Sequence, residues 1–426
     1  MIAKNIPYYK QLGYSSSIKG IRKILENRIG LYGNAIRIEL VIYMDKEGKS
    51  KEGCPIAKSI IRRSSSQEIV LALVRRRKGH KCQSSYIIVS IVVWDAIDLQ
   101  FADNLFDMIV NKVNDYGIPT KRRCAQNESK TCGCQGTDIS TNGACYSYGC
   151  GWSMFTNGCK FRNSQHKNIR KFRLKKRNHE YELEYHLNKL ATGLATLYEA
   201  IAPDAYHNQI FFEKQGSDCR VGNGNGRPFS GVTVCLDFCA HTHKDQHNMN
   251  NGSTLVVTLT NRSHLKTDCI DEQFHVLPMY SIARYDELGS VDKQLSKLNT
   301  DSINILNKYP QIKRILSTSR QLKSKKNKND KTLLDTNECQ QTKKIDLNND
   351  NITEYYSDNE LCFEDKSMGG LGLALTHRSV LFECAKHELH STTSLKQPNR
   401  RNPSRISLVL YQHRALNHPK HGFNKK

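Results

Sequence analysis

The chain has 426 residues, 15 cysteines and a formal charge of +23, from 64 lysines and arginines against 41 aspartates and glutamates. This length is sufficient for two or three domains with buried cores, so a small scaffold held mainly by disulfides is excluded. Such a strong positive charge indicates a polyanionic partner, for which nucleic acid and anionic membrane are the usual candidates.

The first part of the chain predicts two amphipathic helices and a buried strand. Apolar residues recur at helical spacing over residues 17–29, after Ser17 as a cap and before Gly30 as a stop signal. A second helical pattern runs over residues 98–117. The longest apolar run, 86–94, is too short to span a bilayer and has the length of a buried strand. Membrane is therefore the weaker candidate partner.

The cysteines indicate metal ligation. The amino-terminal residues "MIAKNIPYYKQLG" lack the apolar core of a secretory signal, so we expect a reducing compartment in which disulfides are rare. Ordinary buried thiols are the alternative for any single cysteine. The densest group lies at 124–159, where glycine, asparagine, serine and threonine dominate, and this segment is interpreted as loop held by metal.

The second half of the chain is interpreted as rich in strands. A helix at about 180–201 and a glycine-rich turn at 222–226 precede alternating apolar runs at 231–239, 253–260, 273–280, 373–384 and 405–413. Lysine, asparagine, aspartate, serine and threonine dominate from about 291 to 367. We therefore expect a disordered insertion looped out of a β domain, with a short helix at 303–316 inside it.

The stretch "CAHTHKDQHNMNNGST", residues 239–254, is dense in potential metal ligands. On an extended chain His243 and Asp245 share a face, which suits two adjacent coordination positions. A third ligand from His387 or His390 would complete the two-histidine, one-carboxylate triad typical of non-haem Fe(II) oxygenases. The alternative is a set of polar loop residues or a zinc site made of His241, His243 and His247.

The last apolar run sorts by alternation into two faces. Arg405, Ser407, Val409, Tyr411 and His413 share one face, and the intervening residues are aliphatic up to residue 410. An inward arginine is costly unless it meets an anion, so this face suits a small dicarboxylate at one end and a larger substrate at the other. A structural salt bridge is the alternative for Arg405.

Eight segments make the chain resemble the TET family of 5-methylcytosine dioxygenases. They are "GCPIAKSIIRRSSS", "RRCAQNESKTCGCQG", "WSMFTNGCKF", "APDAYHNQI", "RPFSGVTVCLDFCAHTHKDQHNMNNGST", "DEQFHVLPMY", "LALTHRSVLFECAKHELHSTT" and "RISLVLYQH". The resemblance covers most of the chain from about Pro7 to His421, apart from the insertion. It implies an α+β fold with a double-stranded β-helix (jelly-roll) catalytic core and a zinc-stapled cysteine-rich domain packed around it. The expected divisions are a cysteine-rich zinc-binding region at 1–174, the β-helix at 175–290 and 368–426, and the insertion at 291–367.

The resemblance also implies roles for individual residues. The iron ligands would be His243, Asp245 and His390. The 2-oxoglutarate contacts would be Arg122, Cys235, His275, Arg405 and Ser407. The flipped base would be read by Asn248, Tyr411 and His413, with Thr233 supporting the tyrosine. The remaining DNA contacts would be Trp152, Lys160 and Ser164, with Met154 and Phe155 pressing on the base step.

Two zinc sites are implied in the same way. One would use Cys54, Cys132, Cys134 and His241, and the other Cys150, Cys159, Cys219 and His421. A third site would have His80 and Cys82 only, because the family's two upstream cysteines have no counterpart here, so we expect it to be lost or the amino terminus to be truncated. Gly151 occupies a position that is usually serine.

The expected activity follows from the resemblance. It is oxidation of 5-methylcytosine in duplex DNA to 5-hydroxymethylcytosine, and onward to the formyl and carboxyl products, with Fe(II), 2-oxoglutarate, O2 and Zn(II). The expected protein is a nuclear, monomeric, compact invertebrate-type member without a membrane partner. It has no CXXC zinc-finger module, so a separate CpG-targeting protein is a further expected partner. The alternatives are a 5-methylcytosine oxidase acting on RNA, and a non-catalytic chromatin scaffold of the same fold.

Overall fold

Five helices lie among the residues that the computed structural model describes. These residues are 6–50, 53–120, 134, 138–153, 158–159, 174–175, 178–261, 271–306, 309, 311–316, 352–357, 363 and 365–417. The helices are α1 (Ile18–Ile29), α2 (Leu99–Tyr116), α3 (Asn178–Ile201), α4 (Pro203–Ile210) and α5 (Val291–Asn299). None of them is both long and apolar enough to cross a membrane.

The capping residues explain the ends of the first two helices. The Ser17 hydroxyl accepts a hydrogen bond from the Gly20 amide at the start of α1, and Gly30 ends that helix in the left-handed conformation with φ of 71°. Asp98 caps the start of α2 in the same way, and Gly117 follows its last residue. The predicted helices at 17–29, 98–117 and 180–201 are therefore confirmed.

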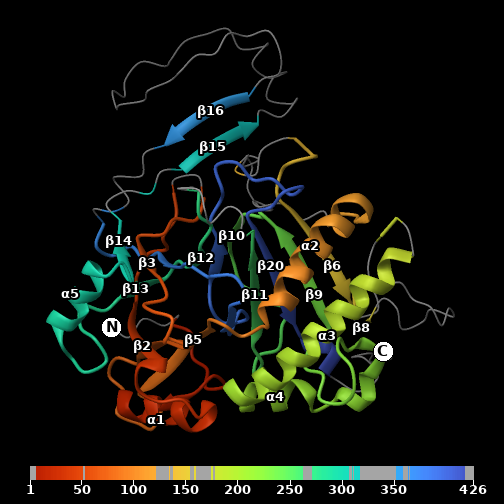
Figure 1. Cartoon of the computed structure of the whole chain (residues 1–426). Coiled ribbons are helices and arrows are strands. Elements are labelled where there is room, and N and C mark those ends of the chain that lie inside the picture. The colour runs from red at the N-terminus through yellow and green to blue at the C-terminus, as the bar shows by residue number, and fades with distance from the viewer. Residues whose placement is uncertain are drawn as a thin grey trace.

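A ten-stranded mixed sheet forms the centre of the molecule (Figure 1). Its strand order is β13-β2-β4-β5-β18-β11-β20-β9-β6, with β1 paired to β5. The bounds are β1 (Tyr14–Ser15), β2 (Ile36–Tyr43), β4 (Val70–Arg76), β5 (Tyr86–Val93), β6 (Ala144–Gly149), β9 (Gly231–Leu236), β11 (Thr254–Thr260), β13 (Tyr280–Ile282), β18 (Val380–Glu383) and β20 (Arg405–Tyr411). This sheet therefore contains strands from the expected cysteine-rich region at 1–174 and strands from the residues that follow it.

A second sheet has six strands in the order β10-β19-β12-β17-β3-β14. The bounds are β3 (Ser59–Ile61), β10 (Ala240–His243), β12 (His275–Leu277), β14 (Ile303–Ile305), β17 (Leu371–Leu373) and β19 (His390–Thr392). Two further pairs are β7 (Trp152–Ser153) with β8 (Gly158–Cys159), and β15 (Gln311–Leu316) with β16 (Ile352–Ser357). The strands predicted from the alternating runs of the second half are confirmed.

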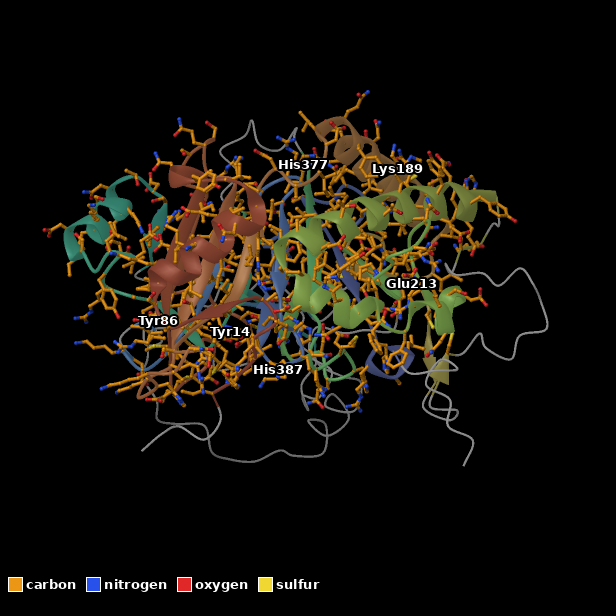
Figure 2. All side chains as sticks on the ribbon, turned by 90° about the horizontal axis from the view of Figure 1, so that it is seen from below. Tyr14, Tyr86, Lys189, Glu213, His377 and His387 are labelled. Atoms are coloured by element: carbon orange, nitrogen blue, oxygen red, sulfur yellow. The ribbon has the colours of Figure 1, made fainter. Side chains whose placement is uncertain are left out.

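The two largest apolar clusters of the described residues both include residues of the ten-stranded sheet. One apolar cluster joins that sheet to α1, α2 and α3, which cover its outer face. Figure 2 views the molecule from the helical side. There Lys189 of α3 lies over the Phe101 ring of α2, and His377 pairs with Asp103 of α2. A second cluster, including Val256 and Leu277, is shared by the two sheets. The layers are thus helices, ten-stranded sheet and six-stranded sheet.

Three expectations about local structure were wrong. The cysteine-rich segment at 124–159 is not all loop, because β6 pairs with β9 and β7 with β8. The proposed helix at 303–316 is replaced by β14 and β15. The expected disorder is also wrong for residues 291–306, which include α5 and β14. Ile303 is buried there because β14 pairs with β3 at the edge of the smaller sheet. Polar composition concealed these strands, and β6 and β14 pair with strands far along the chain.

Candidate metal centre and its pocket

Three side chains converge where the smaller sheet brings β10 and β19 together. His243 ends β10 and lies directly opposite His390, the first residue of β19, across an irregular antiparallel register. Their ring centroids are 4.2 Å apart. Asp245 follows β10, with one carboxylate oxygen 3.5 Å from His243 Nε2 and the other 3.9 Å from His390 Nε2. One donor atom from each residue lies within 4.8 Å of the other two.

Backbone carbonyls orient both imidazoles. His243 Nδ1 lies 2.8 Å from the carbonyl oxygen of His241, and His390 Nδ1 lies 3.3 Å from that of Glu388. Neutral rings therefore carry their protons on Nδ1 and turn their Nε2 lone pairs toward Asp245. Two imidazole nitrogens and one carboxylate on one side of a cavity match the facial triad of non-haem Fe(II) oxygenases. The predicted iron ligands are thus close together, and their chemistry fits this metal.

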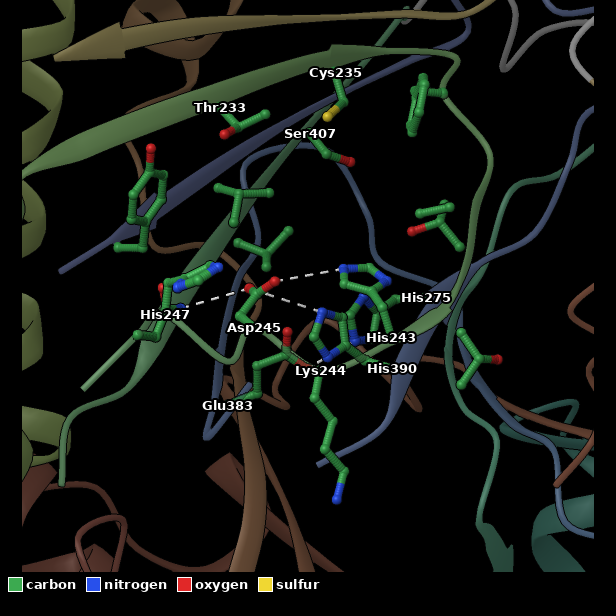
Figure 3. Close-up of a pocket in the computed structure, with 18 of the residues that line it drawn as sticks. Thr233, Cys235, His243, Lys244, Asp245, His247, His275, Glu383, His390 and Ser407 are labelled. Carbon is green, nitrogen blue, oxygen red and sulfur yellow. Dashed lines mark hydrogen bonds and ion pairs between the residues drawn. The ribbon is translucent and has the colours of Figure 1, made fainter. Parts of the chain in front are cut away.

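The triad lies in a pocket of about 730 Å³ between the two sheets (Figure 3). The predicted site residues that line it are Thr233, Cys235, His243, Asp245, Asn248, His275, His390, Arg405, Ser407, Tyr411 and His413. The inward face of β20 predicted by alternation is therefore correct. Figure 3 shows Thr233, Cys235 and Ser407 on one wall and the triad on the opposite side.

A buried cation forms one end of the pocket. Arg405 donates hydrogen bonds to the Gln273 carbonyl oxygen at 3.1 Å and to the Thr258 hydroxyl at 3.4 Å. Its Nε has no hydrogen-bond partner among the described residues. Burial lowers the pKa of Arg405 to about 10, so the guanidinium stays charged at neutral pH. No residue described here forms a salt bridge with this arginine, so it suits an anionic ligand better than the salt bridge considered above.

A buried acid–base pair lies beside the triad. His275 Nε2 and a Glu383 carboxylate oxygen are 2.9 Å apart, and both side chains are buried. Burial opposes ionisation of Glu383, but the charges of His275 and His390 and the hydrogen bond from His275 outweigh it and lower the pKa of Glu383 to about 2. This carboxylate therefore fixes the orientation of His275, one of the predicted cosubstrate residues.

The other end of the pocket carries hydrogen-bonding groups. Asn248 and His413 form an isolated bridge, and the Asn248 amide donates to the Thr254 hydroxyl at 2.9 Å. Burial, with the charges of His247, Arg414 and Lys386, lowers the pKa of His413 to about 4, so the ring is neutral at physiological pH. The Ala415 amide donates to His413 Nδ1, which leaves the proton of the neutral ring on Nε2.

Two groups of cysteines form further candidate metal sites. Sulfur atoms of Cys150 and Cys159 lie 2.7 Å apart, and Cys219 Sγ lies 3.3 Å from Cys150 Sγ. The neighbouring thiols and burial raise the pKa of Cys150 far above its usual range, whereas a bound cation would favour the thiolate. The second group is Cys134, Cys239 and His241. Cys54 is buried but is not part of it.

Seven of the predicted site residues lie outside the part of the chain that the structure describes. Those outside the described residues are Arg122, Cys132, Met154, Phe155, Lys160, Ser164 and His421. Trp152 lies on β7, opposite Cys159. His80 and Cys82 are exposed, and His80 Nε2 and Cys82 Sγ both approach the Arg77 guanidinium.

The family comparison agrees with this geometry. The family model for Tet_JBP, described as the oxygenase domain of the 2OGFeDO superfamily, matches residues 151–414. The chain belongs to this Tet/JBP oxygenase family. Membership supports Fe(II) as the metal of the site and 2-oxoglutarate and O2 as its cosubstrates. The matched residues include the triad, Arg405 and both walls of the pocket.

The curated relatives of this Tet/JBP oxygenase are much longer proteins. The chain is 34% identical to methylcytosine dioxygenase TET1 of Mus musculus over 98% of its own length and 29% of the relative. It is 46% identical to methylcytosine dioxygenase TET of Drosophila melanogaster over 73% of its length and 11% of the relative. It is 50% identical to methylcytosine dioxygenase TET2 of Mus musculus over 71% of its length and 16% of the relative. The chain thus spans less than a third of each of these relatives.

Three residues of the site were missed from the sequence. Glu383 lines the pocket, and its signal was a carboxylate at the end of the otherwise apolar run "VLFE". Cys239 joins Cys134 and His241, and its signal was the two-residue spacing to His241. His247, which was named only in the alternative zinc set, stacks on His413 with ring centroids 5.5 Å apart, and nothing in the sequence pattern indicated that contact.

Proposed function

We propose that this chain oxidises 5-methylcytosine in DNA to 5-hydroxymethylcytosine, and onward to 5-formylcytosine and 5-carboxylcytosine. The observation that carries the proposal is one pocket with three parts: the triad at its side, the buried cation of Arg405 at one end, and the Asn248–His413 bridge at the other. A pocket of this kind suits a metal, a small dicarboxylate and a polar ring together. The names of the relatives support the choice of methylcytosine as the ring.

In this proposal the chain's residues hold the reactants in fixed places. His243, Asp245 and His390 bind Fe(II), which together with O2 and 2-oxoglutarate supplies the oxidising chemistry when bound. Arg405, which lines the pocket, pairs with a carboxylate of the cosubstrate, and Ser407 and Cys235 lie on the adjacent wall. His275, held by Glu383, contributes a further polar contact, as does Arg122. The protein's own contribution is to position these groups and to exclude water.

The other end of the pocket would read the base. The Nε2–H of neutral His413 is a donor for a pyrimidine carbonyl oxygen, and the Asn248 amide offers both a donor and an acceptor. Tyr411 would stack on the ring, supported by Thr233. A methylcytosine can enter only if it is flipped out of the duplex, which costs a few kcal/mol. Contacts from the basic chain to phosphates would offset that cost, and we assign them in part to Trp152, Lys160 and Ser164, with Met154 and Phe155 against the neighbouring base step.

We further propose that zinc joins the cysteine-rich residues to a double-stranded β-helix core. The sulfur group of Cys150, Cys159 and Cys219 would be completed by His421, and Cys134 with His241 by Cys132 and Cys54. The proximity of Cys239 makes it a competing ligand at the second site. The divisions at residues 174, 290 and 367 remain predictions, as does the incompleteness of the third zinc site, for which His80 and Cys82 are the only ligands expected here.

The expected partner is methylated duplex DNA, bound by a monomer in the nucleus. A net charge of +23 supports a polyanionic partner. Selection of CpG sites would be left to a separate targeting protein.

The deciding experiment combines the purified chain, Fe(II), ascorbate and 2-oxoglutarate with methylated duplex DNA or methylated RNA, followed by nucleoside mass spectrometry. We expect 5-hydroxymethylcytosine from DNA, and its loss in His243→Ala. Product from RNA alone would favour the RNA oxidase. Absence of product from both polymers, with wild type and His243→Ala indistinguishable, would favour the scaffold.

A separate measurement of bound iron compares His243→Ala with His247→Ala. His247 lines the same pocket but lies outside the triad, so this variant should retain iron binding. Equal loss of iron in both variants would refute the assignment of His243 as a ligand.

A further inference from the structure

Two cysteine sulfur atoms lie together beside the cosubstrate end of the pocket. Cys145 of β6 and Cys235 of β9 are directly opposite each other in the antiparallel register, and their sulfur atoms are 2.8 Å apart. As thiols, one donates a hydrogen bond to the other. Both side chains are buried, and neither belongs to the three metal-ligand groups found among the described residues.

The hydrogen-bond pattern of β6 favours a covalent bond between them. The carbonyl oxygen of Cys145 accepts from the Thr120 amide, so it points away from β9. The Cys150 amide donates to the Ser230 carbonyl, and alternation from that pair also makes Cys145 and Cys235 a non-hydrogen-bonded pair. In such pairs the Cα atoms approach to about 4.5 Å and the side chains come close. That separation lies within the range that a disulfide spans.

We propose that Cys145 and Cys235 form a reversible disulfide that regulates cosubstrate binding. The regulation rests on the proposed function, but formation of the bond does not. The oxidant is a peroxide: the Cys235 thiolate attacks one peroxide oxygen, the O–O bond breaks, and a sulfenic acid and one water form. The Cys145 thiol then attacks the Cys235 sulfur and displaces a second water. Two thiols thus lose two electrons and two protons, and the peroxide is reduced to two waters.

The pocket gives the oxidant a route to only one of the two sulfurs. Cys235 lines the pocket, whereas Cys145 does not. Arg405 lines the same pocket, and a positive charge at this end of the pocket favours the reactive thiolate of Cys235. Cys235 is therefore the cysteine that peroxide reaches first, and Cys145 is the one that resolves the sulfenic acid.

A disulfide would change the surface that the cosubstrate meets. Register pairs Cys235 with Ser407, and Ser407 with Thr258, so these side chains form a row across neighbouring strands. Arg405 donates to Thr258 at the end of this row. Closing the sulfur separation from 2.8 Å to about 2.05 Å would draw Cys235 toward β6 and remove its S–H group from the row. We expect weaker 2-oxoglutarate binding while the metal ligands stay in place.

The test treats the full chain with hydrogen peroxide before iron is added, removes the excess with catalase, alkylates the remaining thiols and maps the peptides by mass spectrometry. We expect two peptides linked through Cys145 and Cys235. Their combined mass should be two hydrogens below the sum of the two reduced peptides. We also expect a rise of about tenfold or more in the apparent KM for 2-oxoglutarate, reversed by dithiothreitol. Zinc content, measured in parallel, should not change.

Cys145→Ser is the matched variant, and Cys145→Ala replaces it if the hydroxyl impairs folding. Either should retain the basal KM and lose both the linked peptide and the reversible rise. The proposal is overturned if wild type gives no linked peptide, if the linkage leaves KM unchanged, or if the variants respond to peroxide as wild type does. If untreated chain shows no methylcytosine oxidation, the proposed function fails, yet the peptide map still decides whether the disulfide forms.

Discussion

Arg405 illustrates how far one buried side chain can define a ligand. Its charge is retained at neutral pH, its surroundings give it two neutral acceptors, and its Nε–H has no partner among the described residues. A cation in this state is stabilised most by an anion that enters the pocket. The residue therefore argues for an anionic ligand independently of the metal ligands.

Replacing Arg405 tests that assignment. We expect Arg405→Ala to raise the apparent KM for 2-oxoglutarate by roughly 100-fold, because a buried carboxylate would lose a charged partner. Arg405→Lys should recover only part of the affinity, since a single ammonium lacks the forked donors of arginine. Steady-state kinetics with varied 2-oxoglutarate measure this, and an unchanged KM in Arg405→Ala would contradict the role.

His413 predicts a dependence of stability on pH. Burial lowers its pKa to about 4 in the folded chain, whereas an unfolded histidine titrates near 6.5. As the pH falls below about 6.5 the unfolded chain gains a proton first, so stability that is present above this pH is lost progressively toward pH 4. Between pH 7 and pH 5 we expect wild type to lose about 1–2 kcal/mol more stability than His413→Gln. Urea unfolding at the two pH values measures the difference, and equal losses would show that His413 is not responsible.

Among the elements, the turn between β18 and β19 depends on residues from the start of the chain. Glu388, two residues before His390, is buried and accepts hydrogen bonds from Tyr9 at 2.7 Å and Tyr280 at 2.8 Å. Burial raises the pKa of Glu388, and the two phenol hydrogen bonds oppose that shift. The carbonyl oxygen of the same residue orients the His390 ring. The amino-terminal segment thus helps to position a metal ligand.

Tyr9→Phe tests this connection. It removes one of the two donors to a buried carboxylate, so we expect a loss of about 1–3 kcal/mol in unfolding free energy and weaker iron binding. Tyr8→Phe is the control, since Tyr8 is 44% exposed, and its effect should lie within about 0.5 kcal/mol. Chemical unfolding and iron titration of both variants give the comparison. Similar stability of the two would exclude Glu388 as a fixed anchor.

The sequence predicted those elements whose signals are local. The cap at Ser17, the glycine after α1 and the alternation along β20 each lie within one short window, and they were correct. β6 and β14 were not predicted, because their pairing depends on β9 and β3, which lie far away in the sequence. Within the site, resemblance supplied the residue roles, while the contacts of Glu383 and the pairing of Cys145 with Cys235 required three-dimensional proximity.

At the scale of the whole molecule, the sulfur group of Cys150, Cys159 and Cys219 connects segments from both sides of α3. We expect Cys219→Ser to lower the zinc content by about one ion per chain and to lower stability by more than about 3 kcal/mol, because structural zinc contributes folding energy directly. Cys82→Ser is the control, since Cys82 is exposed and lies outside the groups identified among the described residues. Metal analysis and thermal unfolding measure both, and a stable variant with full zinc content would refute the role of zinc.

The order of the ten-stranded sheet has a consequence for biosynthesis. β5 lies between β4 and β18, so one side of β5 waits for a partner that is translated much later. At about 5–20 residues per second, that interval on the ribosome lasts tens of seconds. During this time the edge of β5 that will pair with β18 has unpaired N–H and C=O groups, and the metal ligands His243 and His390 remain apart until β19 emerges. This topology leaves the growing polypeptide with an unpaired strand edge long before it can acquire a metal.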